Sequence, residues 1–487
     1  MRRLLLSIGL SILVAASAVA QPTRADIDGV MKRATAFMAD KVAYRGGYVW
    51  TVSEDLSTRW GEIPARPSQI WVQSPGTPHV GMALLDAFDV TRDPLYLATA
   101  RRAADALIFG QHPKGGWHYF VDFDPAGLEA WYATRASQFE YGYEEFRHYY
   151  GNATNDDQVT SSAAAFILRF YATTLDAAYR GPALKALEFV LEAQYPNGAW
   201  PQRYPLRYEF AHDSLPDYTS YYTLNDGAMQ GYIELLLTAY RTLGDARYFE
   251  AARRGVDFLI AAQGPDGEGA WAEQYGADMK PIAARTHEPA GYVTRESRDV
   301  LRLLEMFYVL TGDQRYLTPI PRCLAWYDRV NREAIELKRP PARYWQPGTN
   351  LPVYVVRRNA HNGDGYGLFE WTTTAPAGLE VKPAIDVAPI RAEYEQVAAL
   401  TTREAREAYY AAHVARSRRE SPTAAQVDAI IKGLDARGAW VTDGIMVHAL
   451  TTSGKNPGSQ VPVRGISTGV FIRNLSALTS AYQAATR

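Results

Sequence analysis

The heptapeptide Gln194-Tyr195-Pro196-Asn197-Gly198-Ala199-Trp200 follows an apolar helical stretch and recurs in looser form along the chain. It returns at 111–117 and at 263–271, with fainter echoes at 45–50 and 435–440. Proline cannot continue a helix, and glycine accepts the positive φ of a helix C-terminus. Each copy therefore predicts a helix that ends in a tight turn, with a Trp packed against the neighbouring helix. A unit that recurs about every 70 to 85 residues is typical of stacked helical hairpins.

These repeats predict an all-α fold, an α/α toroid formed as an incomplete α/α barrel of helical hairpins. Residues 343–356 alternate apolar and polar side chains around Pro347-Gly348, which predicts a small β-hairpin region. Residues 442–463 are expected to form an exposed loop. We expect residues 21–372 to be the toroid, and residues 373–487 to be a linker and a C-terminal helical extension packed on it.

The N-terminus has the pattern of a bacterial signal peptide over residues 1–20. Arg2-Arg3 precedes an apolar stretch, which ends at Ala18-Val19-Ala20. We therefore expect a periplasmic or secreted protein, and we expect it to be a monomer that is not embedded in a membrane. Removal of this segment leaves 49 basic against 53 acidic residues, which argues against nucleic acid or an anionic membrane as a partner. The single cysteine, Cys323, excludes an internal disulfide and a thiolate metal cluster.

Three polar clusters stand just before or on helices that follow a Trp turn: Thr154 to Asp157, Asn225-Asp226, and Arg285 to Glu288. Each alone reads as an ordinary helix cap. Their recurrence in successive repeats predicts that they converge on one cleft if the ring closes. Neighbouring carboxylates raise each other's pKa unless a cation lies between them, and Ca²⁺ prefers oxygen ligands of this kind.

The run 152–358 resembles the family 10 polysaccharide lyases, which are pectate lyases with an α/α-toroid fold. Residues 193–202 with Tyr204-Pro205-Leu206 are close to the family's most recognisable stretch, and Asn225-Asp226-Gly227-Ala228-Met229 matches its N-D-D-A-M motif. Thr154 to Thr160 fits its D-N-x-A-T segment and places Asp156 on the aspartate. The family's next motif is matched, in the same order, by Ala270-Trp271, Gln274, Ala284-Arg285 and Glu288. Residues 342–352 then lead to Arg357, where the family also has an arginine.

The resemblance implies a Ca²⁺-assisted β-elimination of a 4-linked uronate polymer similar to pectate or polygalacturonate. It implies that Asp156 and Asp226 hold the calcium ion, and that Arg285 and Arg357 bind carboxylates of the acidic polysaccharide. To substrate binding we further assign Asn225, His287, Tyr204 and Tyr222.

The sequence departs from the family where the catalytic base is expected. The second aspartate of N-D-D is Gly227 here, and Arg358-Asn359 stands where the family has Asp-Gly. The family's R-R-x-G-Y segment carries its arginine base, but Gly365-Tyr366 has no arginine before it in 359–369. The candidates for the base are therefore Arg358, His361, Tyr366 and His287.

Three functions other than a lyase share features with this sequence. An exported glycan-binding relative without catalysis also fits the missing base. An inverting glycoside hydrolase would need an acid and a base carboxylate, for which Glu288 and Asp156 are available. A triterpene cyclase shares the Gln-to-Trp turns, but this sequence has no D-x-D-D segment and is predicted to be exported in soluble form.

Overall fold

The computed structural model describes residues 22–126, 128, 151–206, 211–212, 215–216, 218–285, 287–359, 368–417, 422–448 and 460–485. The predicted signal peptide lies outside these residues. Within them, no helix is long and apolar enough to cross a membrane.

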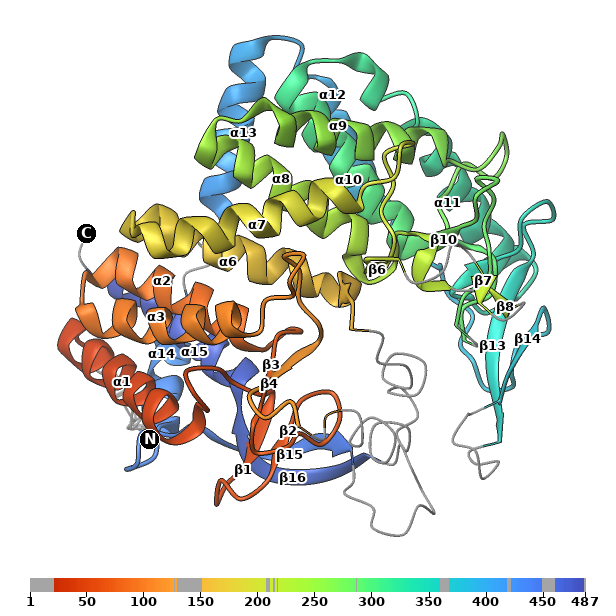
Figure 1. Ribbon diagram of the computed structural model, residues 1–487. Helices are drawn as coiled ribbons and strands as arrows, with labels where there is room; N and C mark the ends of the chain where they lie inside the picture. The colour runs from red at the N-terminus through yellow and green to blue at the C-terminus, as the bar shows by residue number, and fades with distance from the viewer. Residues whose placement is uncertain are drawn as a thin grey trace, which may run out of the picture.

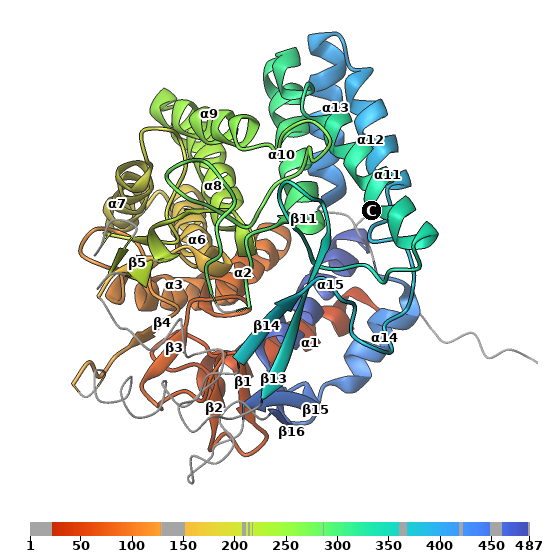
Figure 2. The same cartoon turned by 90° about the vertical axis from the view of Figure 1, so that its right-hand side faces the viewer.

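Antiparallel helical hairpins build the molecule (Figure 1). The pairs in contact are α2 (Thr77–Thr91) with α3 (Pro94–Phe109), α6 (Val159–Thr174) with α7 (Ala177–Ala193), α8 (Ala228–Leu243) with α9 (Ala246–Ala261), and α10 (Thr294–Thr311) with α11 (Ile320–Glu336). A further pair joins the chain ends, α1 (Arg24–Phe37) with α15 (Thr468–Ala484). Helices α15, α2, α6, α8 and α10 contact one another in that order, so the hairpins form the arc seen in Figure 2. The predicted α/α toroid is confirmed.

Four of the Trp turns, all but the one at 45–50, close on the preceding helix through the same indole hydrogen bond. The indole Nε1 of Trp200 donates to the carbonyl oxygen of Val190 at 2.8 Å, and Trp117, Trp271 and Trp440 donate equally to Leu107, Leu259 and Ile430. The side-chain amide of Gln194 bridges Gly198 within the turn to Ala251 on the next outer helix, at 2.9 Å each. Gly198 has φ +97°, and a Cβ there would lie 2.1 Å from the carbonyl oxygen of Arg254. The Gln, Gly and Trp of the repeat are therefore fixed by hairpin packing.

The C-terminal residues pack on both ends of the arc. Helices α12 (Ala388–Ala398) and α13 (Arg403–Ser417) contact α10, whereas α14 (Ala424–Gly433) contacts α1 and α15. The predicted boundary between residues 372 and 373 stays a prediction.

The prediction of an exposed loop over 442–463 is wrong for 442–448 and 460–463, whereas residues 449–459 lie outside the described residues. Strands β15 (Val441–His448) and β16 (Gln460–Ser467) form a hairpin there. They extend a sheet with β1 (Thr51–Ser53) and β2 (Arg59–Trp60) in the order β15-β16-β1-β2. The partner strand β1 lies about 400 residues away in sequence, and pairing of this kind depends on context that local patterns do not contain.

The predicted hairpin around Pro347-Gly348 is confirmed. Strands β12 (Tyr344–Trp345) and β13 (Pro352–Asn359) pair with Tyr344 opposite Val353, and the sheet continues as β11 (Tyr292–Val293) on one side and β14 (Leu368–Thr372) on the other.

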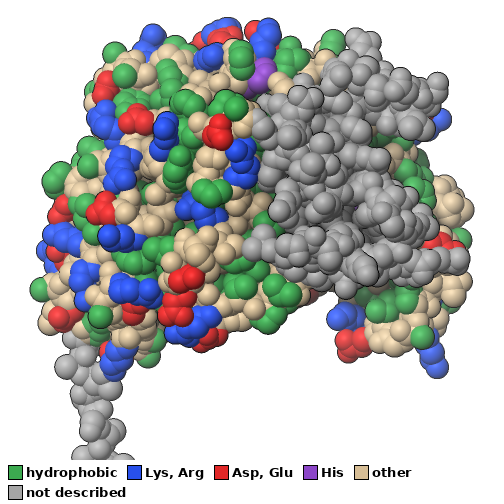
Figure 3. All heavy atoms as spheres, turned by 60° about the horizontal axis from the view of Figure 1, so that its bottom comes forward, with side chains coloured by type: hydrophobic (Ala, Val, Ile, Leu, Met, Phe, Trp, Pro, Cys, Tyr) green, Lys and Arg blue, Asp and Glu red, His purple; other side chains and the backbone are tan. Residues whose placement is uncertain are grey.

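Short two-stranded ribbons follow the Trp turns and connect successive repeats. They are β3 (Gln69–Trp71) with β4 (Phe120–Asp122), β5 (Ala153–Thr154) with β6 (Arg203–Tyr204), and β9 (Tyr222–Thr223) with β10 (Gln274–Tyr275). A further ribbon is β7 (Ala211–His212) with β8 (Leu215–Pro216). The short helices are η1 (Met38–Val42), η3 (Asp156–Gln158), η4 (Tyr218–Ser220), η5 (Asn225–Gly227) and η6 (Gln314–Tyr316). On the described part of the face in Figure 3, basic and acidic side chains are interspersed with apolar ones.

Candidate functional site

Two nearly identical turns carry the polar residues of the first two clusters. The turn η3 leads into α6 with Asp157 at φ +49° and Gln158 at φ +58°, and η5 leads into α8 with Asp226 at φ +52° and Gly227 at φ +69°. Left-handed backbone is uncommon for residues other than glycine, although Asp tolerates it better than most. The backbone therefore pairs Asp157 with Asp226. The two predicted calcium ligands, Asp156 and Asp226, would be expected at matching places if their clusters were equivalent, but Asp156 corresponds to Asn225.

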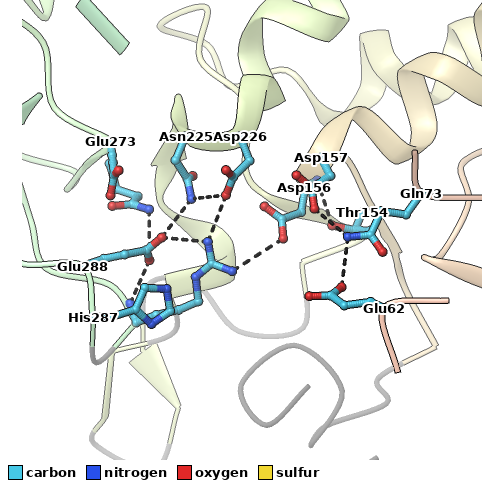
Figure 4. Close-up of polar contacts among 12 residues, drawn as sticks. Glu62, Gln73, Thr154, Asp156, Asp157, Asn225, Asp226, Glu273, His287 and Glu288 are labelled. Carbon is cyan, nitrogen blue, oxygen red and sulfur yellow. Dashed lines mark hydrogen bonds and ion pairs between the residues drawn. The ribbon is translucent and has the colours of Figure 1, made fainter. Parts of the chain in front are cut away.

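The guanidinium of Arg285 lies at the centre of the site, between carboxylates from three segments (Figure 4). Its Nη2 is 3.1 Å from Asp226 Oδ2 and 2.7 Å from Glu288 Oε1, and its Nη1 is 3.7 Å from Asp156 Oδ2. Arg285 is 5% exposed and comes from the loop between β10 and β11. The cation between the two predicted calcium ligands is thus the protein's own arginine in this structure, and its described contacts are to protein carboxylates.

Glu288 is held by hydrogen bonds on both oxygens. Asn225 Nδ2 donates to Oε1 at 3.0 Å, while Gln274 Nε2 at 3.3 Å and the main-chain N–H of Arg285 at 3.1 Å donate to Oε2. Burial alone would raise the pKa of Glu288, but the charge and hydrogen bonds of Arg285 lower it to about 2. Glu288 is therefore ionised, and its carboxylate fixes the positions of the Arg285 guanidinium and the Asn225 amide.

Asp156 is 1% exposed and only partly satisfied by hydrogen bonds. Its Oδ2 accepts a hydrogen bond from Tyr119 OH at 2.6 Å, whereas its Oδ1 is buried without a hydrogen-bond partner in the described part of the chain. Asn225 is equally buried, and its Oδ1 also lacks such a partner there. Burial raises the pKa of Asp156, against the opposing effect of Arg285. Buried oxygens are normally hydrogen-bonded, so these two are available to a ligand that enters the site.

The N-terminal segment adds a second group of acids to the site. Gln73 Nε2 donates to Glu62 Oε2 at 3.0 Å and to Asp157 Oδ2 at 2.6 Å. Burial raises the pKa of Glu62 to about 7 and that of Asp157 to about 8, and the neighbouring carboxylates add to both shifts. The site as a whole has more carboxylates than cationic groups to balance them.

These features fit a calcium ion. Asp156, Asn225 and Asp226 offer oxygen ligands, which are the ligands that Ca²⁺ prefers, and the surplus negative charge favours a cation. Among the residues that the structure describes, no three Asp, Glu, His or Cys side chains are gathered closely enough to hold a metal ion. An ion here would therefore need the Asn225 amide, water or a ligand carboxylate to complete its coordination.

The structure brings five of the predicted site residues together: Asp156, Asn225, Asp226 and His287, which Figure 4 labels, and Arg285, which contacts both aspartates. Burial, together with the charge of Arg285, lowers the pKa of His287 to about 4, so its imidazole is neutral at physiological pH.

The two tyrosines predicted to bind substrate, Tyr204 and Tyr222, pack against other aromatic rings. Tyr222 is 9% exposed between Tyr195 and Phe258, and Tyr204 packs edge-on against Phe189. These contacts leave little of the Tyr222 ring for a ligand.

The predicted residues of the base segment are described only in part. The backbone of Arg357 and Arg358 forms part of β13, but the structure does not describe their side chains. His361 and Tyr366 lie outside the described residues altogether. Their assignment stays a prediction.

The sequence interpretation missed Glu62, Gln73, Tyr119 and Asp157. Asp157 directly follows Asp156, which was predicted as a calcium ligand, and its left-handed backbone recurs at Asp226. Tyr119 follows a Trp turn by two residues. Glu62 and Gln73 are an acidic and an amide residue within residues 60–76, which are otherwise rich in Pro, Gly and Trp. Their polarity in this segment is the one sequence feature that could have marked them as site residues.

Residues 130–344 match the pectic acid lyase family. The match confirms the resemblance carried by the motifs, and it includes Asp156, Asn225, Asp226, Arg285 and Glu288. It covers somewhat less than half of the chain and leaves out Glu62, Gln73 and Tyr119.

Solved structures of similar shape include helical enzymes of several kinds. A family 10 polysaccharide lyase from Cellvibrio cellulosa shares 20% identity over 57% of this chain and 84% of its own, with a TM-score of 0.39. A mutant of such a lyase from the same organism, in complex with trigalacturonic acid, shares 22% identity over 52% of this chain and 72% of its own, with a TM-score of 0.36. An α-1,6-mannanase from a Salegentibacter species shares 12% identity over 95% of this chain and 99% of its own, with a TM-score of 0.40. No curated protein sequence matches the chain significantly.

Proposed function

We propose that the protein is an exported polysaccharide lyase that cleaves a 4-linked uronate polymer of the pectate type by β-elimination. The observation that carries the proposal is the convergence of Asp156, Asp226 and Arg285, from three separate segments, inside the region that matches the pectic acid lyases.

Elimination from a uronate requires positive charge near the substrate carboxylate. The proton on the carbon next to that carboxylate is hardly acidic while the carboxylate keeps its full charge, so cationic groups must stabilise the enolate-like state that follows. Asp156, Asn225 and Asp226 would hold Ca²⁺, which supplies electrophilic stabilisation of that carboxylate when bound.

Arg285 keeps these ligands in place. Its guanidinium neutralises part of their charge and fixes the Asp226 and Asp156 carboxylates relative to Glu288. Because Asn225 and Gln274 also donate to Glu288, the arginine is anchored from the side opposite Asp156. This preorganised arrangement is what electrostatic catalysis requires.

The same contacts weigh against a glycoside hydrolase with Glu288 as its acid. A general acid needs a raised pKa so that it is protonated at the working pH. The pKa of Glu288 is lowered to about 2 beside Arg285, so it is ionised at any physiological pH.

The test is incubation with a panel of uronate polymers, followed by the ultraviolet absorbance of the unsaturated product. A lyase produces this absorbance, and the Asp226→Ala variant should not. New reducing ends without absorbance would indicate a hydrolase, and binding without products would indicate a non-catalytic glycan-binding protein. Either result would refute the proposed reaction.

A further inference from the structure

Glu62 approaches the site from a part of the chain that the lyase match does not include. It lies in the loop between β2 and β3, whereas Asp156, Asp226 and Arg285 lie within residues 130–344. In Figure 4 Glu62 lies beneath Gln73, on the side of Asp156 that is opposite to Glu288. Asp156, Asp226 and Arg285 are near enough to shift its pKa. The N-terminal segment therefore contributes a carboxylate to this site.

A buried amide fixes the orientation of Glu62. Gln73 is 2% exposed, and its Oε1 accepts a hydrogen bond from the indole Nε1 of Trp71 at 3.0 Å. With its oxygen bound to the indole, Gln73 must present its Nε2 to the two carboxylates, Glu62 and Asp157. One hydrogen bond from this nitrogen goes to Asp157 Oδ2 and the other to Glu62 Oε2, which fixes the position of the Glu62 carboxylate. Its Oε1 has no hydrogen bond with any of the residues that the structure describes.

We infer that Glu62 is the general base of the proposed elimination, held in position by Gln73 and Trp71. The inference rests on the proposed function and replaces the base that the sequence lacks at the family's position. A base must first be held within reach of the proton, and a buried amide provides this positioning. The bound cation would receive the substrate carboxylate, and Glu62 faces the group of residues that would hold that cation from across Asp156.

The step balances within the substrate and one carboxylate. Glu62 takes the proton from the carbon next to the substrate carboxylate, and the C–H electron pair becomes the new carbon–carbon double bond. The bond between the neighbouring carbon and the glycosidic oxygen breaks, its electron pair stays on that oxygen, and the oxygen takes a proton from water. Glu62 then returns its proton to solvent. No oxidant or reductant is needed.

Glu62 is a stronger base than the histidine in the same site. Burial raises the pKa of Glu62 to about 7, whereas the pKa of His287 is lowered to about 4. Proton transfer is most efficient when the pKa of the base lies near the working pH.

The test compares Glu62→Gln and Glu62→Ala with the wild-type enzyme on the polymer that it cleaves. Glu62→Gln preserves the shape and the hydrogen bond from Gln73, so we expect kcat to fall by about 100-fold or more while KM changes little, as for loss of a general base. Formate should restore part of the Glu62→Ala rate, because a small carboxylate can enter the space left by the side chain. A residue with only a structural role would not be rescued. Glu54→Gln, on the same N-terminal segment and paired with Arg464 on the surface, is the control and should behave as wild type.

The outcomes separate the two proposals. If the wild type yields unsaturated product and Glu62→Gln retains a kcat within ten-fold, the base is elsewhere and the lyase assignment stands. Loss that appears in KM alone, or an inactive Glu62→Ala that formate does not rescue, also overturns the assignment of Glu62. If the wild type forms no unsaturated product from any uronate polymer, both proposals fail.

Discussion

The side-chain amide of Gln158 packs against Gly227, so that a Cβ added to the glycine would lie 2.4 Å from Gln158 Nε2. Gly227 stands where the related lyases have the second aspartate of their N-D-D motif, and Gln158 comes from the equivalent turn of the preceding repeat. Gln158 thus occupies the space into which a side chain at position 227 would extend.

This packing predicts that Gly227→Asn destabilises the protein by about 1 to 3 kcal/mol through crowding, and that Gln158→Ala relieves most of the cost in the double variant. Chemical denaturation of the four proteins in this cycle measures the coupling. Gly244→Asn is the control, because Gly244 has a similar φ of +73° but open space around its Cβ position. Equal costs at the two glycines would show that backbone strain alone is responsible.

The hairpin architecture was predictable because its signal is local and repeated. Gln194, Gly198 and Trp200 act within one turn and on the next outer helix, and the same hydrogen bonds recur in the turns at 111–117 and 263–271. The sheet that joins β1 to β16 was not predictable, because its partners lie at opposite ends of the chain.

Site residues were predictable from the sequence only where the local pattern around them, such as a turn before a helix, indicates their role. Asp226 and Asn225 were found from their place before a helix. Glu62 and Gln73 were missed because their role depends on the N-terminal segment folding against η3, which no local pattern encodes. Arg285 was found, but its described partners are Asp226, Glu288 and Asp156, which only the structure reveals.

Arg285→Lys should lower both activity and stability. Lysine keeps the positive charge but loses the planar fork, so it cannot serve Asp226 and Glu288 together and still reach Asp156. We expect kcat/KM to fall ten-fold or more, about 1.4 kcal/mol, and the free energy of unfolding to fall by about 1.5 to 3 kcal/mol for a lost charged hydrogen bond. Steady-state kinetics and urea denaturation measure these effects.

The control is Arg247→Lys, because the ion pairs of Arg247 with Asp245 and Glu188 are exposed. This substitution should change the free energy of unfolding by less than about 1 kcal/mol. Wild-type kinetics in Arg285→Lys would remove the arginine from the mechanism.

Calcium should bind the wild-type protein and should be required for activity. Titration calorimetry on chelator-treated protein should show binding that Asp226→Ala weakens at least ten-fold. At a calcium concentration of 100 times the dissociation constant, the ion should stabilise the wild type by about 2.7 kcal/mol, which a thermal scan detects. Asp278→Asn, on an exposed loop, is the control for charge loss. Full lyase activity in excess chelator would contradict a role for calcium.

Asp157 should make the calcium-free protein less stable as the pH rises. The pKa of Asp157 is about 8 in the folded protein and near its ordinary value of 3.8 in the unfolded chain. Between these values the folded state retains a proton that the unfolded state has lost, so the free energy of unfolding declines with pH, by up to about 1.4 kcal/mol per pH unit. Asp157→Asn has no such proton, and asparagine tolerates the left-handed backbone at this position.

The comparison is best made between pH 7 and 8, because other groups act in the opposite direction at lower pH. Buried histidines such as His118 and His287 have lowered pKa values, so they make stability rise with pH up to about 6.5, the ordinary pKa of histidine. Denaturation at several pH values in chelator should give a shallower decline for Asp157→Asn than for the wild type, while Asp278→Asn follows the wild type. Added calcium should flatten the wild-type curve, since a cation favours the ionised carboxylates. Parallel curves for wild type and Asp157→Asn would show that this carboxyl group ionises normally in the folded protein.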